Sequence, residues 1–321
     1  MVSMVGEIWL LGGVTASGKT DLALSWAENN NAEIISCDSV AFYRGLDLGS
    51  AKPTPEEQER VPHHGLDLAD VHEVFDVVRF HDYAKNVVQD IAGRGKKILV
   101  VGGSGFFLNG FLRPVTDGIE ISAEVRQSIE EQYQSKGLRS LLEDLDKLNP
   151  AGLGIDIQNP VRVIRALERC VQTGKSLAVL QQEFERLPVP YGDLCKHALW
   201  LDRKEDELME RIHARTQKMV KGGILEEAEV ALRQGIETHP SLSVSVGYRE
   251  AIESIKNRPT TSSSGLVDSI TRSTRQLVAK QRKWFRKHFP PDSCITLSDS
   301  RPVSDGALPW VRVLDRTAGS N

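Results

Sequence analysis

A glycine-rich segment, Gly13–Thr20, has the residue types and spacing of a phosphate-binding loop. Its sequence, GVTASGKT, matches G-x-x-x-x-G-K-[ST] and lies between an apolar run, Ile8–Leu11, and a run of helix formers, Asp21–Ala27. In such a loop, backbone N–H groups and the start of the following helix attract phosphate oxygens. The lysine neutralises the outer phosphate, and the last hydroxyl can hold a magnesium ion. A plain glycine-rich turn is the alternative. The segment predicts a phosphate or diphosphate site formed by Gly13, Thr15, Ala16, Ser17, Gly18, Lys19 and Thr20, with Thr20 as the metal ligand.

The loop does not specify which phosphate ester it binds. A nucleoside triphosphate is the commonest ligand of such loops, but the chain has no Asn-Lys-x-Asp motif to read guanine. The apolar run Ile98–Val101 ends in glycines and not in the Asp that usually completes a nucleotide-hydrolysing magnesium site. These two features weaken the case for a nucleotide hydrolase and leave other diphosphate esters open.

Two charged residues are candidates to act beside the loop. Asp38 follows the predicted strand Glu33–Cys37, at the edge where open parallel sheets bind ligands. It is either a general base or metal ligand there, or a residue that starts a turn with Ser39. Arg215 shares one helical stripe with apolar neighbours, so its guanidinium must meet either an anion in a cleft or a buried acid. Arg211 lies beside the stripe and is expected at the surface. The stripe consists of Leu208, Ile212, Arg215 and Met219.

Two predicted helices carry basic faces. Between Ile270 and Pro290 there are seven basic residues and no acidic one, opposite an apolar side, which indicates contact with an RNA backbone; a plain charged surface is the alternative. Arg162, Arg165 and Arg169 fall on one face of a second helix, where pairing with acids such as Glu168 is the alternative. The seven are Arg272, Arg275, Lys280, Arg282, Lys283, Arg286 and Lys287.

The order of apolar and helical runs predicts the α/β class, with a phosphate-loop core whose parallel sheet is flanked by helices. The strand signal disappears over 119–196, which indicates an inserted all-helical subdomain between core segments 1–118 and 197–290. Residues 291–321 show little periodicity and are expected to be a tail, partly flexible.

Composition excludes several classes of protein. The chain has 321 residues and a net charge of −4, so an RNA partner must meet a local basic surface. The four cysteines are far apart, which argues against a disulfide framework or a zinc knuckle. No export signal or membrane span is found, so we expect a cytoplasmic protein, monomeric and without an obligate protein partner.

Several short blocks, in order over residues 8–286, resemble the tRNA dimethylallyltransferases. So many ordered blocks are more specific than the phosphate loop alone. The blocks are Gly13–Thr20, Ile35–Ser39, Tyr43–Gly45, Leu48–Pro53, Pro62–Asp67, Val101–Gly105, Arg162, Arg165–Glu168, Val246–Glu250 and Thr274–Leu277.

This resemblance implies transfer of the dimethylallyl group from dimethylallyl diphosphate to the exocyclic amino nitrogen of the adenosine 3′ of a tRNA anticodon. It implies that Asp38 takes the proton, that Ser104 lies near the flipped adenosine, and that Lys19, Thr20 with Mg²⁺ and Arg215 hold the diphosphate. The catalytic set is thus Asp38, Ser104 and Arg215. The implied tRNA contacts, which reach the anticodon stem-loop, are Asp38, Ser39, Val40, Ala41, Ser104, Arg126, Arg162, Arg165, Arg275, Gln276, Arg282, Lys283 and Arg286.

Some positions depart from the usual pattern of that family. Val14 replaces a Pro, Ala41 a frequent Gln and Ser104 a Thr, while Val278–Lys280 stands where Ala-Lys-Arg is common. None of these changes removes a residue expected to act in the chemistry. The competing functions are an adenylate isopentenyltransferase that modifies a free nucleotide, a phosphate-loop kinase, and a non-catalytic nucleotide-binding module.

Overall fold

The computed structural model describes residues 6–150, 152–257, 262–300 and 308–313. The chain forms two compact units. One, called here the helical unit, is Pro114–Val189; the other, the core unit, comprises the chain before and after it. The boundaries differ by a few residues from the predicted insertion, 119–196.

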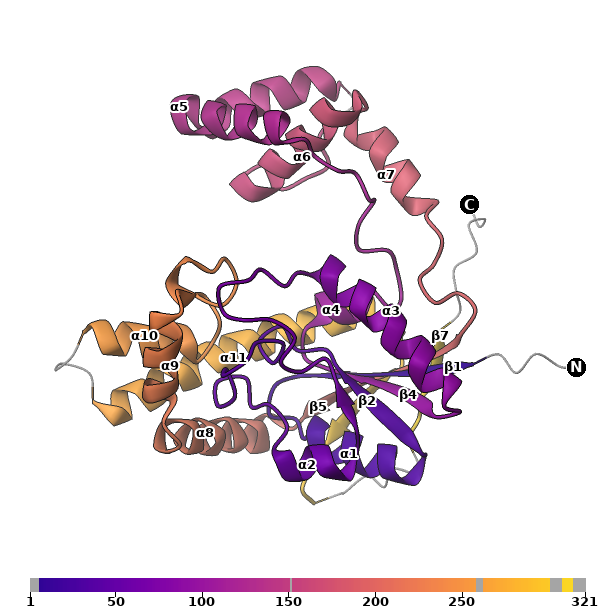
Figure 1. The fold of residues 1–321 in the computed structure, drawn as a ribbon, viewed down its shortest axis with the longest axis vertical. Helices are drawn as coiled ribbons and strands as arrows, with labels where there is room; N and C mark the ends of the chain where they lie inside the picture. The colour runs from indigo at the N-terminus through magenta and orange to yellow at the C-terminus, as the bar shows by residue number, and fades with distance from the viewer. Residues whose placement is uncertain (1–5, 151, 258–261, 301–307, 314–321) are drawn as a thin grey trace, which may run out of the picture. The chain divides into compact units, whose positions relative to one another are not determined.

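A mixed sheet forms the centre of the core unit (Figure 1). Its strand order is β3-β2-β4-β1-β5-β6, all parallel, and β7 runs antiparallel to the first half of β5. The predicted α/β fold with a parallel sheet is confirmed. The strands are β1 (Glu7–Gly13), β2 (Ala32–Ser36), β3 (His63–His64), β4 (Lys97–Val101), β5 (Cys195–Arg203), β6 (Cys294–Leu297) and β7 (Val311–Val313).

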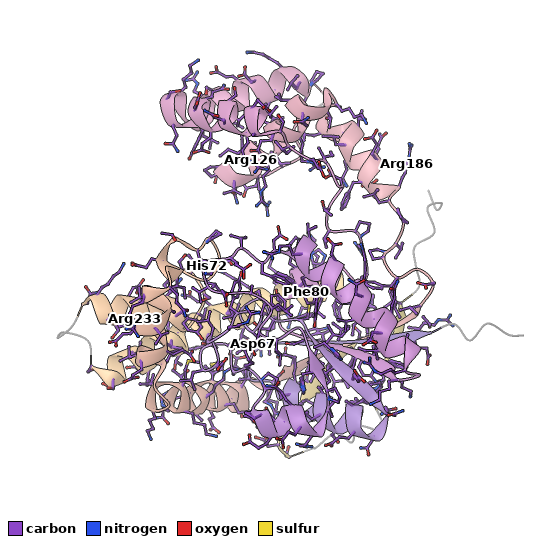
Figure 2. All side chains as sticks on the ribbon, viewed as in Figure 1. Asp67, His72, Phe80, Arg126, Arg186 and Arg233 are labelled. Carbon is purple, nitrogen blue, oxygen red and sulfur yellow. The ribbon has the colours of Figure 1, made fainter. Side chains whose placement is uncertain are left out.

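Helices cover both faces of this sheet. Ile8 and Leu10 of β1 pack on the side of α3 and α4, whereas Trp9 and Leu11 pack on the side of α1. Because side chains alternate along a strand, a strand covered on both faces is apolar throughout, which is why β1, β2 and β4 are recognisable in the sequence. Phe80 of α3 is fully buried on its face of the sheet (Figure 2).

The remaining helices of the core unit follow β2 or β5. Helices α8 to α11 lie together beside the sheet in Figure 1. The helices of this unit are α1 (Lys19–Asn29), α2 (Pro55–Arg60), α3 (Val77–Gly93), α4 (Gly105–Asn109), α8 (Glu205–Lys221), α9 (Ile224–Arg233), the 3₁₀ turn η1 (Ile236–Thr238), α10 (Tyr248–Lys256) and α11 (Ser263–His288).

The helical unit contains α5 (Ala123–Leu148), α6 (Pro160–Thr173) and α7 (Leu177–Glu185) around a small apolar core. Helix α6 begins and ends at its sequence signals: Asn159 caps the Arg162 N–H, Pro160 is the first residue, and Gly174 ends the helix at φ 67°. Helix α5 is interrupted at Gly137, whose φ of 74° is not helical.

The C-terminal segment contains two short strands that the sequence did not indicate. Residues 291–321 were expected to form a partly flexible tail, and within them Cys294–Leu297 pairs with β5 as β6 and Val311–Val313 pairs with β5 as β7. Strands of three or four residues are too short to show a periodic pattern, so the sequence gives no signal for them. Residues 301–307 and 314–321 of this tail lie outside the described residues. None of the helices in the described ranges is long and apolar enough to cross a membrane.

Candidate active site

The phosphate loop connects the end of β1 to the start of α1 and is supported from behind by β5. The Val14 N–H donates to the Leu201 carbonyl at 3.0 Å. A Cβ on Gly13, at φ 152°, would lie 2.7 Å from that same carbonyl oxygen, so this position requires glycine. Lys19 Nζ donates to the carbonyls of Gly13 at 2.9 Å and Val14 at 2.7 Å. The Lys19 side chain therefore lies against the phosphate loop, where it is expected to contact a bound phosphate.

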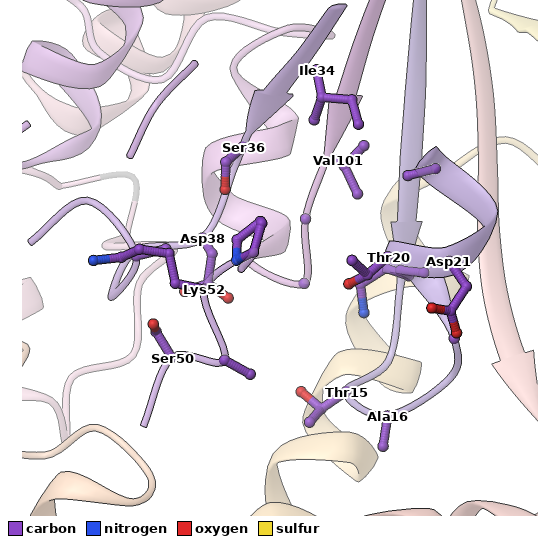
Figure 3. Close-up of a pocket in the computed structure, with 18 of the residues that line it drawn as sticks. Thr15, Ala16, Thr20, Asp21, Ile34, Ser36, Asp38, Ser50, Lys52 and Val101 are labelled. Carbon is purple, nitrogen blue, oxygen red and sulfur yellow. The ribbon is translucent and has the colours of Figure 1, made fainter. Parts of the chain in front are cut away.

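A cavity of about 340 Å³, called here the first cavity, opens beside this loop. Figure 3 shows Thr15, Ala16 and Thr20 on one side of it and Asp38, Ser50 and Lys52 on the other. Of the predicted diphosphate residues, Thr15, Ala16, Gly18, Lys19 and Thr20 line this cavity. Gly13 and Ser17 are buried in the loop behind it.

Asp38 lies at the site because the chain just after β2 is held close to the end of β4. The Cys37 N–H donates to the Val101 carbonyl at 2.7 Å, and a Cβ on Gly102 would lie 2.1 Å from the Cys37 carbonyl oxygen. Only glycine permits this close approach. Asp38 Oδ1 accepts the Val40 N–H at 3.0 Å, so the residue does start a turn. This bond occupies one carboxylate oxygen, and the side chain still lines the first cavity.

Arg215 projects from α8 into the same space. The only hydrogen bond that its guanidinium makes within the described ranges is a long one, from Nη2 to the Ser50 carbonyl at 3.5 Å, and no carboxylate there forms an ion pair with it. Burial lowers the pKa of Arg215, and the negative charge of Asp38 acts in the opposite direction. Of the two alternatives drawn from the sequence, this geometry favours the cleft over a buried acid.

Arg211 was expected at the surface. Its side chain is 37% exposed, and it also lines the first cavity, one helical turn before Arg215. A long side chain at the edge of an apolar stripe can still reach inward, which spacing alone does not indicate. Its Nη1 lies 3.4 Å from Asp299 Oδ1, just beyond β6.

A second cavity, of about 350 Å³, shares residues with the first. Ser104 and Gln276 line this second cavity, together with Ser39 and Val40, whereas the buried Ala41 lines the first. The two cavities meet at Thr15, Asp38, Ser50, Gly103 and Arg215. Two ligands, one in each cavity, could therefore approach each other beside Asp38 and Arg215.

Gln281, a buried residue of α11 that was not among the predicted site residues, connects α11 to two other segments of the site. Its Oε1 accepts the Thr15 N–H at 2.9 Å, and its Nε2 donates to the Gly103 carbonyl at 3.1 Å. A signal was available, because Gln281 lies between Val278 and Phe285 on the buried stripe of α11, where a polar side chain needs polar partners. The prediction for α11 was based on its basic residues, so this polar residue on the buried side was not considered.

Six of the seven basic residues predicted on one face of α11 are exposed, and they are Arg272, Arg275, Lys280, Lys283, Arg286 and Lys287. Arg282, also predicted to contact tRNA, is only partly exposed and pairs with Asp202 at 2.9 Å and with Glu205 at 2.6 Å, because it lies on the side of α11 that faces β5 and α8. A shallow hollow of about 470 Å³ on this face is lined by Ala279, Arg282, Lys283, Arg286 and Lys287.

The arginines of the helical unit divide in the same way. Arg162 and Arg165 are exposed on α6. Arg169, expected on their face, pairs with Asp117, and Arg126 of α5 (Figure 2) lies 4.0 Å from Glu168. The pairing alternative thus holds for Arg169 and in part for Arg126. Arg162 and Arg165 project from α6 into solvent.

Comparisons with known proteins identify the family. Residues 41–288 match the model of the IPP transferase family. This chain belongs to the IPP transferase family. The chain is 45% identical over 282 residues to a tRNA dimethylallyltransferase of Opitutus terrae, covering 88% of this chain and 90% of that one. It is 33% identical to the enzyme of the same name from Thermotoga maritima, covering 88% and 90%.

Solved structures of IPP transferases agree with this fold. The tRNA isopentenylpyrophosphate transferase of Bacillus halodurans is 31% identical, with a TM-score of 0.64, and the match covers 91% of this chain and 89% of that one. A eukaryotic dimethylallyltransferase acting on tRNA matches with a TM-score of 0.77 over 91% and 73% of the two chains. Its sequence identity is 23%, so this last likeness concerns the fold alone.

We expect the protein to take up a proton when a diphosphate ester binds to this site above neutral pH. Burial, followed by the nearby charge of Arg215, lowers the pKa of Lys19 to about 7, against the opposing effect of Asp38. Above that pH the amine is mostly neutral in the free protein, whereas a bound diphosphate favours the ammonium form. The affinity of the site for a diphosphate ester should therefore fall between pH 7 and pH 9.

Calorimetry at pH 8 in two buffers of different ionisation enthalpy would measure this proton uptake. Lys19→Arg is the control, because arginine stays charged throughout this range and should remove the part of the uptake that Lys19 supplies. Equal uptake by both proteins would assign the proton to the diphosphate itself.

Proposed function

We propose that this IPP transferase moves the dimethylallyl group from dimethylallyl diphosphate to the exocyclic amino nitrogen of the adenosine 3′ of a tRNA anticodon. The observation that carries this proposal is the meeting of two cavities at Asp38 and Arg215. In this assignment the donor diphosphate occupies the first cavity, beside the phosphate loop, and the adenine enters the second, beside Ser104.

The residues at the junction suit the charges that develop in this reaction. The bond between the allylic carbon and the diphosphate oxygen breaks, a bond from that carbon to the adenine nitrogen forms, and the nitrogen loses a proton. Lys19 and Arg215 stabilise the negative charge of the departing diphosphate. Asp38, at the point shared by both cavities, accepts the proton. The phosphate loop therefore holds a leaving group and not a group to be transferred.

Magnesium fits the oxygen atoms that line the first cavity. The Thr20 hydroxyl and the Asp21 carboxylate both lie there, at the start of α1 (Figure 3). Oxygen ligands of this kind, completed by phosphate oxygens, are those that Mg²⁺ prefers. Thr20 is the residue we assign to hold the ion, with Asp21 beside it. When bound, the ion would add positive charge at the diphosphate.

An RNA acceptor is supported by the exposed cations of two helices. Arg275, Lys283 and Arg286 of α11 can contact a phosphate backbone, as can Arg162 and Arg165 of α6. These contacts position the RNA without reading its sequence. A transferase that acts on a free nucleotide does not need these exposed cations. We therefore assign the helical unit and the basic face of α11 to tRNA binding. Extrusion of the base from its stack allows it to enter the second cavity.

The direct test is transfer of labelled dimethylallyl diphosphate to unmodified tRNA that carries adenosine next to the anticodon. Label should enter that tRNA, as shown by nucleoside analysis, and should not enter AMP. Label on AMP alone would support the free-nucleotide alternative. Phosphate transfer from ATP, with no use of the prenyl donor, would support the kinase alternative.

We expect Lys283→Glu to weaken tRNA binding roughly tenfold with little change in donor affinity, because it reverses one charge on the basic face while the first cavity stays intact. The slope of log affinity against log salt should become shallower by about one. Filter binding across a salt series measures both quantities. Lys85→Glu on α3, another exposed lysine, is the matched control. A matched loss of donor and tRNA affinity would contradict the assignment of this face.

A further inference from the structure

Another group of chemistry-bearing side chains lies at the opposite end of the sheet from the phosphate loop, where β1 and β5 begin. Glu7 and Cys195 are partners in the parallel register of the two strands, and His197 follows two residues along β5 on the same face. One ligand atom from each of the three residues lies within 4.8 Å of both others. The proposed transfer reaction uses none of these residues.

The ligand atoms of Glu7 and Cys195 both lie near the same ring nitrogen of His197. His197 Nε2 is 3.0 Å from Glu7 Oε1 and 3.7 Å from Cys195 Sγ. Tetrahedral zinc at ordinary bond lengths separates a nitrogen ligand from an oxygen ligand by about 3.3 Å and from a sulfur ligand by about 3.6 Å. These two separations differ from the tetrahedral values by a few tenths of an ångström, and the carboxylate and sulfur ligand atoms lie within 4.8 Å of each other. Side-chain rotations would bring all three atoms onto one ion.

A nucleophilic triad does not fit the same atoms. Such a triad needs the thiol on one nitrogen of the imidazole and the carboxylate on the other, so that a proton can pass across the ring. Here both partners contact Nε2. Donors that converge on one point are typical of a chelate and not of a relay.

The surroundings hold the imidazole in place and leave the group accessible. The His197 ring stacks on Trp9 with centroids 5.2 Å apart, which restricts its rotation. The Glu7 side chain is 46% exposed, so an ion can enter from solvent. The neighbouring cation Lys97 lies over the Trp9 ring and donates to Asn30, and the exposed Arg312 is the register partner of His197 on β7. A thiolate and a carboxylate supply two negative charges against a divalent ion.

We propose that Glu7, Cys195 and His197 bind a zinc-class divalent cation, with a water molecule as the fourth ligand. A thiolate and an imidazole favour Zn²⁺ or Co²⁺ over Mg²⁺ or Ca²⁺. The bound ion fastens the start of β5, where the chain returns from the helical unit, to the start of β1. Its effect is on stability, because the phosphate loop lies at the other end of β1.

The test is a Co²⁺ titration of the full-length protein after treatment with a chelator. We expect one equivalent to bind and to produce a thiolate-to-cobalt charge-transfer band, which Zn²⁺ removes by displacement and excess Mg²⁺ does not. Cys195→Ser and His197→Ala should lose the band. Cys294→Ser, which changes the exposed cysteine of β6, is the matched control and should keep it. Circular dichroism verifies that each variant is folded.

Thermal unfolding gives a second measurement. Zn²⁺ should raise the melting temperature of the wild-type protein and of Cys294→Ser but not that of Cys195→Ser, because a ligand of the native state stabilises it by mass action. The proposal fails if the wild-type protein gives no thiolate band, or if the band survives Cys195→Ser. Cobalt binding without a thiolate band would also overturn it and would place the ion at a carboxylate or phosphate-loop site.

Discussion

Replacing Asp38 by asparagine should lower the rate of prenyl transfer by about 10²–10⁴-fold, the usual contribution of a positioned general base. The amide oxygen can still accept the Val40 N–H, so the turn after β2 should survive the change. The basic carboxylate oxygen is lost, and the attacking amine then has no group at the junction of the two cavities to take its proton. Single-turnover transfer to tRNA measures this step separately from product release.

Donor and tRNA affinities distinguish a chemical role of Asp38 from a structural one. Both affinities should stay within a few fold of wild type, and so should the melting temperature. Asp70→Asn, an exposed carboxylate that pairs with Arg44 at 2.9 Å, is the control and should keep full activity. An unchanged rate in Asp38→Asn would remove the proposed base. A parallel loss of donor binding would make Asp38 part of the diphosphate site instead.

Replacing Arg215 by glutamine should lower kcat/KM for the donor by about 10²–10³-fold, as expected when one preorganised donor to developing negative charge is removed. The Arg215 side chain is partly buried beside the first cavity and forms no ion pair within the described residues, so a bound anion would compensate its desolvation more fully than Asp38 does alone. Arg215→Lys should recover part of the activity, because it keeps the charge and loses the two-pronged geometry.

The same argument predicts the sign of a stability change. Removing a partly buried charge that has no ion-pair partner within the described residues should leave the ligand-free protein as stable as wild type or more stable, although activity falls. The rise in melting temperature that diphosphate produces should shrink in Arg215→Gln, because the ligand loses a partner. A large drop in the melting temperature of the ligand-free variant would show that Arg215 supports the fold, and would count against its assignment to the leaving group.

The central sheet could be predicted because its strands are buried on both faces. Such strands are continuous apolar runs, as in β1 and β4, and the turns after them are rich in glycine. Helix α6 was equally legible from Asn159, Pro160 and Gly174, since capping is a local property. Strands β6 and β7 escaped because they are short and owe their conformation to pairing with β5, a long-range contact that the sequence does not display.

The candidate site was only partly legible. The phosphate loop and the position of Asp38 at a strand end follow local rules. The surroundings of Arg282 and Arg211 do not follow local rules, because each arginine pairs with a carboxylate that lies far from it in the sequence. Arg282 pairs with Asp202, and Arg211 pairs with Asp299. Gln281 was missed for a different reason. Its importance comes from two backbone groups that lie far from it in the sequence, at Thr15 and Gly103.

The position of β5 has a consequence for how the protein is made. This strand lies in the middle of the sheet, next to β1, but it is synthesised only after the whole helical unit. Until then β1 can pair with β4 but has no neighbour on its other side, and the Val14 N–H lacks the Leu201 carbonyl that holds the anion-binding turn. A ribosome-bound chain that stops before Cys195 should therefore contain the complete GVTASGKT motif and yet be unable to bind diphosphate.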